Sequence, residues 1–131
     1  LEYDFKNQPD LAQTMIATCC VMNIPFKFVG LSSLKLKETD RIEAMKVEMT
    51  KLGYVLHDSN DSEIIWDGER CEAEKSIVID TYKDHRMAMA FAPLSVKLGE
   101  LTINNPEVVS KSYPNFWNEL RNVGFEIEEI E

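Results

Sequence analysis

Four cationic side chains stand near the predicted starts of helices, where helix electrostatics disfavour them. Lys37 and Arg41 flank one such start, Arg86 lies in the first turn of the next helix, and Lys111 precedes another. A helix N-terminus carries about half a positive charge, so a cation there costs about 0.3–1 kcal/mol. Four unfavourably placed cations in one short chain indicate a bound anion, held jointly by backbone N–H groups, the helix dipole and these side chains. Lys37 and Arg41 are four residues apart and would share a helix face if the helix begins early enough.

Each of these residues also has an ordinary interpretation. Asp10 and Asp84 open the apolar runs DLAQTMIATCCVM and DHRMAMAFAPLSV, and either could be a helix N-cap. Arg41 could pair with Glu38 or with Glu43 on the surface. Lys37 or Lys111, taken alone, could be an ordinary solvated surface lysine. Composition and spacing alone therefore predict an α/β anion-binding fragment and do not decide its activity.

The composition restricts the partners of such a site. The chain has 131 residues, 44% hydrophobic and 28% charged, which is typical of a globular protein. No apolar run is long enough to span a bilayer. The net charge of -9 argues against nucleic acid or an anionic membrane as partner and favours a small anion. The chain starts at Leu1 without a methionine or a signal-peptide pattern, so we expect a piece of a longer protein.

The three cysteines have no metal-ligand spacing. Cys19 and Cys20 are adjacent inside an apolar run, and Cys71 stands alone. An odd count without a CxxC pair predicts buried thiols in a reducing compartment, hence a cytoplasmic location, and no metal site.

An internal duplication organises the chain. Lys37 follows Asp10 by the same 27 residues that separate Lys111 from Asp84, and each lysine precedes a helical stretch. These stretches end in the similar sequences KLGYVLHD and NVGFEIEE. We expect two repeat copies, at about 1–75 and 76–131, and two copies are fewer than an open repeat array needs.

The periodicities within a copy predict its elements. Strands are expected at 1–5, 26–30, 63–66, 76–80 and 101–105, with a further strand after each second helix. The helices after Asp10 and Asp84 are apolar on nearly every side, which indicates burial, whereas the next ones are amphipathic and end at Gly53 and Gly124. The fold class is α/β (α+β), built from repeated β-α-β-α-β-β units.

Four motifs then indicate a family. The chain resembles 5-enolpyruvylshikimate-3-phosphate synthases at four signature motifs, which occur in the same order as in that family. In chain order they are QPDLAQT, LKLKETDRIEAM at 34–45, DHRMAM at 84–89 and VSKSYPNF. The resemblance implies two similar domains of three β-α-β-α-β-β units each, with the active site between them. The chain would be the last two units of the C-terminal domain, and its partner would be the missing N-terminal domain.

The resemblance also implies an activity. Such enzymes transfer the enolpyruvyl group of phosphoenolpyruvate to the 5-hydroxyl of shikimate 3-phosphate and release phosphate, without a metal or organic cofactor. Asp10 matches the aspartate that binds the shikimate hydroxyls and is a candidate general base. Lys37 matches a lysine that binds the shikimate phosphate, and Ser33 stands where many members have an asparagine for that phosphate. Glu38 matches a candidate proton donor to the methylene carbon of phosphoenolpyruvate.

The remaining matches concern phosphoenolpyruvate. Arg41, Arg86 and Lys111 match cations that clamp its carboxylate and phosphate, and His85 would line the same site, although it could also be a purely structural histidine. Planar guanidinium groups suit bidentate binding of both anions. We expect the isolated chain to be inactive, because the residues that complete both substrate sites are absent. Two alternatives stay open: the sibling enzyme that uses UDP-N-acetylglucosamine, and a non-catalytic anion-binding module of the same fold.

Overall fold

A four-stranded sheet forms the base of the molecule. The structure, a computed structural model, describes residues 1–130. Strand β1 (Glu2–Asp4) pairs in parallel with β2 (Phe26–Val29), which pairs antiparallel with β4 (Glu63–Trp66). Strand β3 (His57–Ser59) completes the sheet as an antiparallel neighbour of β4, giving the order β1-β2-β4-β3.

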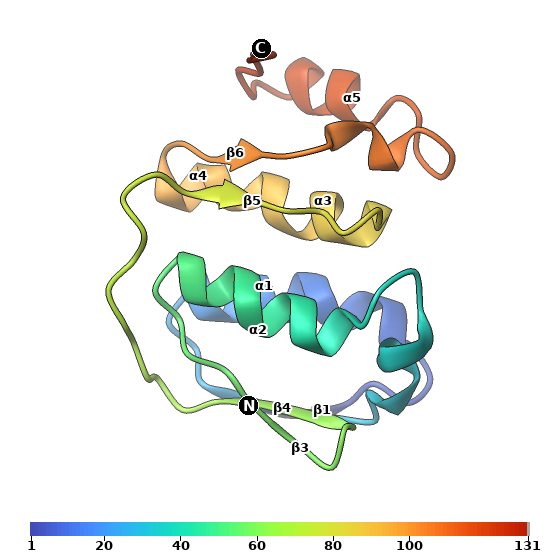
Figure 1. Cartoon of the computed structure of the whole chain (residues 1–131), viewed down its shortest axis with the longest axis vertical. Helices are drawn as coiled ribbons and strands as arrows, with labels where there is room; N and C mark the ends of the chain where they lie inside the picture. Colours follow the sequence, from blue (N-terminus) through green and yellow to red (C-terminus); the bar gives the residue numbers. More distant parts are fainter. Residues whose placement is uncertain (131) are drawn as a thin grey trace.

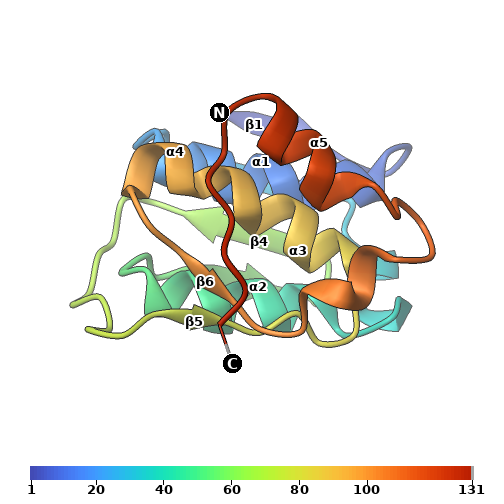
Figure 2. The same ribbon diagram turned by 90° about the horizontal axis from the view of Figure 1, so that it is seen from above.

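Three helices stack above this sheet. Helices α1 (Ala12–Val21) and α2 (Arg41–Lys51) lie side by side between the sheet and α3 (His85–Phe91) (Figure 1). Two short parallel strands, β5 (Val78–Ile79) and β6 (Thr102–Ile103), form a second sheet. Figure 2 shows this second sheet running along α2, and the Lys51 ammonium at the end of α2 donates to the carbonyl of Val78 over 3.0 Å.

The last part of the chain covers α3. Helix α5 (Phe116–Asn122) lies beyond α3 in Figure 1, and Phe116 and Val109 pack against Ala88 of α3. The short helical segments are α4 (Ser95–Leu98), η1 (Pro9–Leu11), η2 (Ser32–Leu36), η3 (Ala92–Leu94) and η4 (Pro106–Val109). Mixed helices and strands agree with the predicted α/β class. None of the helices in residues 1–130 is long and apolar enough to cross a bilayer.

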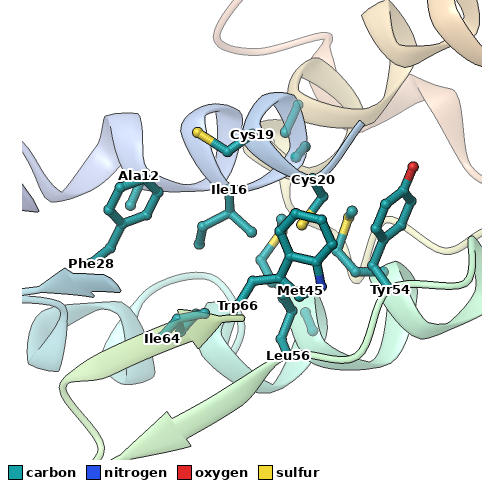
Figure 3. Close-up of a cluster of buried hydrophobic side chains, with 14 of the residues drawn as sticks. Ala12, Ile16, Cys19, Cys20, Phe28, Met45, Tyr54, Leu56, Ile64 and Trp66 are labelled. Carbon is teal, nitrogen blue, oxygen red and sulfur yellow. The ribbon is translucent and has the colours of Figure 1, made fainter. Parts of the chain in front are cut away.

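The core lies between the sheet and its helices (Figure 3). Ile16 and Cys20 of α1 and Met45 of α2 are buried against Phe28 of β2 and Trp66 of β4. The Trp66 indole N–H donates to the carbonyl of Glu69 over 2.9 Å, so its polar atom is satisfied within the core. This core fixes the positions of α1 and α2, whose N-terminal ends carry the candidate site.

Helix α1 is less enclosed than the sequence predicts. Leu11, Met15 and Met22 follow one another along one side and are 53%, 38% and 57% exposed. The predicted burial of this helix within a layered domain is nevertheless confirmed for most of α1, because seven of its ten residues are buried. Helix α1 packs against the sheet, α2 and α3, and no described element covers its outer side.

Two local predictions are wrong. Cys71 is exposed, whereas Cys19 and Cys20 are buried and all three thiols are free. The segment 125–130 after Gly124 forms no strand, although its first-copy counterpart forms β3. A strand needs a neighbour for its backbone hydrogen bonds, and this segment has none among the described residues.

An ion pair fastens α2 to the edge of the sheet. The Lys46 ammonium donates to Asp58 of β3 over 2.5 Å, and both side chains are partly buried. This hydrogen bond is the largest cause that lowers the pKa of Asp58. A lowered carboxyl pKa contributes stability at neutral pH, and that contribution is lost as the pH falls through the folded value.

We therefore expect Asp58→Asn to destabilise the protein by about 1 kcal/mol at pH 7 and by less at pH 3. Urea unfolding across this pH range measures the effect. Asp67→Asn is the matched control, because Asp67 accepts only the backbone N–H of Glu69 among its described contacts. The explanation is wrong if both variants follow the same pH profile.

Candidate functional site

The start of α2 positions the first group of candidate residues. Helix η2 ends at Leu36, the chain is extended at Lys37, and the Asp40 carboxylate caps α2 by accepting the N–H of Glu43 over 3.1 Å. Helix α2 begins only at Arg41, so Lys37 and Arg41 do not share a helix face. The turn between η2 and α2 instead holds Lys37, Glu38 and Arg41 together.

Arg41 is the centre of the site. Its side chain is 2% exposed and donates to three carboxylates. Nε and Nη2 bind Asp84 in a bidentate pair at 2.7 and 3.0 Å, Nη1 binds Asp10 at 3.0 Å, and Nη2 binds Glu38 at 2.5 Å. The ordinary interpretation of Arg41, a surface pair with Glu38, fits only in part, because the guanidinium is buried. Four of its five N–H donors are already used.

Asp84 is the residue that the sequence analysis underestimated. Its predicted role as N-cap of α3 is confirmed, because it accepts the N–H of Arg86 over 2.9 Å. The same carboxylate, completely buried, also receives both donors of Arg41. A signal was present, since the duplication pairs Asp84 with Asp10, and both aspartates bind the same guanidinium.

Asp10 does not cap a helix. It lies in the 3-10 turn η1, and α1 begins at Ala12 with no side-chain cap, so the N-cap interpretation is wrong at this position. The early turn leaves the Asp10 carboxylate to face three cations. Besides the Arg41 contact, Lys37 Nζ lies 3.8 Å from Oδ1 and Arg86 Nη2 lies 4.0 Å from Oδ2.

The cluster is balanced in charge and open on one side. It holds three carboxylates (Asp10, Glu38 and Asp84) and three cations (Lys37, Arg41 and Arg86). Buried Arg41 and Asp84 form its floor, whereas the side chains of the other four are 34–46% exposed. An added anion would meet Lys37 and Arg86 directly. It would reach Arg41 fully only by displacing a carboxylate.

Comparison with known proteins then identifies the family. The family model for EPSP synthase (3-phosphoshikimate 1-carboxyvinyltransferase) matches residues 1–120. The chain belongs to the EPSP synthase family. The expected resemblance is therefore confirmed, and the site lies on segments that carry the motifs of this family.

Individual EPSP synthases match nearly the whole chain. A 3-phosphoshikimate 1-carboxyvinyltransferase of Bacteroides fragilis (strain YCH46) is 60% identical over 128 residues, which cover 98% of this chain and 31% of that protein. Enzymes of the same name from Clostridium kluyveri and Methanospirillum hungatei are 36% and 35% identical, over 96% and 94% of this chain. The chain thus spans about a third of the length of the curated relatives it matches.

The other residues that the EPSP synthase motifs indicate lie outside the hydrogen-bonded cluster. Ser33 is exposed in η2, and Lys111 is exposed between η4 and α5. Neither has a described contact with Arg41 or its three carboxylates. The segment after η4 nevertheless lies at the same end of the molecule as η1, η2 and the start of α3 (Figures 1 and 2).

The pKa of the Glu38 carboxyl is set by its neighbours in the cluster. A backbone N–H bond is the largest cause that lowers the pKa of Glu38, and Arg41 and His85 lower it further by charge attraction, whereas partial burial opposes them. His85 is the first residue of α3 and is partly buried. With a lowered pKa, Glu38 is ionised at neutral pH while it pairs with Arg41. No group of three His, Cys, Asp or Glu side chains within residues 1–130 is arranged to hold a metal ion.

Proposed function

We propose that this chain is the C-terminal part of an enolpyruvyl transferase. The full-length parent protein would transfer the enolpyruvyl group of phosphoenolpyruvate to the 5-hydroxyl of shikimate 3-phosphate and release phosphate. It would act in the cytoplasm, in aromatic amino acid biosynthesis. Family membership and the shared name of the relatives support this activity.

The observation in the candidate site that best supports this proposal is the environment of Arg41. Arg41 is buried, held from three directions by carboxylates, and flanked by the partly exposed cations Lys37 and Arg86. A buried, rigidly held guanidinium beside two partly exposed cations on an open face suits a small anion better than a surface patch would. We assign Arg41, Arg86 and Lys111 to phosphoenolpyruvate, with His85 lining that site. Lys37, Asp10 and Ser33 are assigned to shikimate 3-phosphate.

Binding of phosphoenolpyruvate would change the partners of Arg41. The carboxylate of phosphoenolpyruvate needs two N–H donors. Glu38 is the less buried of the two carboxylates that Arg41 Nη2 already binds, so it is the one that the substrate would displace. A substrate carboxylate that displaces Glu38 removes the attraction of Arg41 and adds a nearby negative charge. Both changes raise the pKa of Glu38, so substrate binding itself prepares this residue to hold a proton.

The reaction then proceeds by addition and elimination. Asp10 accepts the proton of the 5-hydroxyl as that oxygen forms a bond to C2 of phosphoenolpyruvate. Glu38 gives its proton to C3, which produces a tetrahedral intermediate with a methyl group. The Glu38 carboxylate then takes a proton back from C3, and the bond between C2 and the phosphate oxygen breaks, which restores the double bond; the proton that Asp10 accepted leaves with the phosphate. Arg86 and Lys111 stabilise the charge on the departing phosphate.

The rest of the enzyme is outside this chain. We propose that residues 1–75 form one β-α-β-α-β-β unit of the C-terminal domain and that residues 76–131 form most of a second copy. The order β1, α1, β2, α2, β3, β4 in the first copy supports this division. The N-terminal domain would complete both substrate sites, so the isolated chain is expected to be inactive.

Phosphate release by the full-length parent protein tests the function. The assay contains phosphoenolpyruvate and shikimate 3-phosphate without added metal. Turnover with shikimate 3-phosphate but not with UDP-N-acetylglucosamine supports the proposal. Turnover with only the second acceptor would favour the sibling enzyme, and no turnover by folded protein would favour a non-catalytic anion-binding module.

Lys111→Ala tests the outlying cation. We expect the KM for phosphoenolpyruvate to rise about ten- to hundredfold, because a charge-assisted bond to phosphate is worth about 1.5–3 kcal/mol. The KM for shikimate 3-phosphate should change little. Lys97→Ala, at an exposed lysine of α4, is the matched control. An unchanged KM for phosphoenolpyruvate in the Lys111 variant would remove Lys111 from the clamp.

A further inference from the structure

The turn that precedes Asp84 has an unfavourable backbone. Tyr82 and Lys83 have φ angles of 55° and 57°, so two consecutive non-glycine residues adopt the left-handed conformation. Non-glycine residues in this conformation are strained and persist only where surrounding contacts hold them. Asp84 follows directly, so the same contacts decide where its carboxylate stands.

One of these contacts comes from α2. The Tyr82 hydroxyl donates to the Glu48 carboxylate, which is completely buried. The other Glu48 oxygen accepts the Lys51 ammonium at 2.7 Å and the backbone N–H of Asp80 at 2.9 Å. Burial and the bond to Glu48 raise the pKa of Tyr82, so the hydroxyl remains a donor across the physiological range.

The opposite side of the turn is fixed as well. The Thr81 hydroxyl is placed to donate to the carbonyls of Asn104 and Asn105, at 3.0 and 3.2 Å. The N–H of Asp84 donates to the carbonyl of Thr81 over 2.8 Å and closes the turn. Thr81 therefore ties the turn to the segment after β6, and Tyr82 ties it to α2.

Helix α2 thus holds this turn at two points. Arg41 and Glu48 are seven residues apart, which is two helical turns, and so lie on the same face of α2. Arg41 binds Asp84, and Glu48 binds Tyr82 and the backbone at Asp80. If the second point is lost, the strained turn can relax, and the bidentate geometry between Arg41 and Asp84 changes with it.

We propose that Glu48 and Tyr82 are positioning residues for the anion site. Neither touches the exposed cations Lys37 and Arg86 in the described structure. They act by holding the turn that orients Asp84, which in turn orients Arg41 toward phosphoenolpyruvate. This inference rests on the function proposed above for Arg41.

Tyr82→Phe in the full-length parent protein removes only the hydroxyl. We expect the KM for phosphoenolpyruvate to rise about ten- to hundredfold, since small displacements of substrate-positioning groups have effects of that size. The KM for shikimate 3-phosphate should rise less than the KM for phosphoenolpyruvate, because Lys37 and Ser33 lie on another segment and only Asp10 contacts Arg41. Tyr54→Phe is the matched control, since Tyr54 is a buried tyrosine that follows the same helix, and Tyr82 is partly buried. Glu48→Gln should reproduce the Tyr82→Phe effect.

A rescue variant separates positioning from general packing. Lys83 is exposed, and glycine adopts its left-handed conformation without strain. Adding Lys83→Gly to Tyr82→Phe should therefore recover part of the lost affinity for phosphoenolpyruvate. A purely packing role for the Tyr82 hydroxyl would give no recovery, and this result would overturn the inference.

A second measurement does not depend on activity. Hydrogen exchange of the Arg41 Nε–H reports directly on its bond to Asp84, and the signal is assigned because it is missing in Arg41→Lys. This exchange should be about tenfold faster in Tyr82→Phe than in the parent protein or in Tyr54→Phe. Unchanged exchange in Tyr82→Phe overturns the inference, whether or not the parent protein is active. Absence of turnover in the parent protein refutes the proposed function alone. An active parent with an unchanged KM in Tyr82→Phe overturns the inference alone.

Discussion

Arg41→Met in the full-length protein should lower the free energy of unfolding by about 3–5 kcal/mol. Methionine keeps much of the volume of the side chain, but the completely buried carboxylate of Asp84 loses both of its guanidinium donors. A buried charge left without its partner costs far more than a surface pair contributes. Urea unfolding followed by circular dichroism measures the change.

Two further variants decide whether the buried charge is the cause. Arg121→Met makes the same substitution on the exposed side of α5 and should change stability by less than about 0.5 kcal/mol. Adding Asp84→Asn to Arg41→Met removes the unpaired charge and should recover part of the loss. A loss below about 1 kcal/mol for Arg41→Met alone would show that Asp84 is not held as an ion by Arg41.

Glu38→Gln should lower kcat for phosphate release by about 10²- to 10⁴-fold. Glutamine keeps the shape of Glu38 but cannot deliver a proton to C3 of phosphoenolpyruvate. Unlike loss of a clamp residue, this change should leave the KM for phosphoenolpyruvate equal or lower, because an uncharged amide competes less for Arg41 than the carboxylate does. Steady-state kinetics with both substrates would show this division between kcat and KM.

Glu43→Gln is the matched control for this variant. Glu43 lies in the first turn of α2, and its carboxylate is 3.7 Å from the Lys46 ammonium on the exposed side of the helix. Its kcat should stay within about twofold of the parent value. If Glu38→Gln keeps a kcat within threefold of the parent, another group donates the proton.

Local features of the fold could be predicted from local sequence. The strands β1, β2 and β4 and the amphipathic pattern of α2 follow from periodicity over a few residues. Strand β4 has the expected bounds, whereas β1 and β2 are slightly shorter than expected. Gly53 and Gly124, which follow α2 and α5, have the positive φ angles that were predicted, 99° and 108°. Asp84 caps α3 for the same reason, since a cap involves only its next few neighbours.

Features that need a distant partner could not be predicted this way. The segment after Gly124 has the composition of a strand, but it has no described strand beside it. Cys71 resembles a buried thiol in sequence, yet it lies in an exposed connection. Pairing and burial depend on which segments meet, and a short window of sequence does not contain that information.

The candidate site shows the same division. The residue types, the family motifs and the excess of cations at helix starts can all be read from the amino-acid sequence. The shared binding of one buried guanidinium by Asp10 and Asp84, which are 31 and 43 residues from Arg41, becomes visible only in the folded chain. The physical reason is that helix and turn preferences act between neighbours, whereas burying a charge requires counterions that folding brings from separate segments. Glu48 and Tyr82 had no signal in the sequence, because their role exists only after α2 and the turn before α3 have packed together.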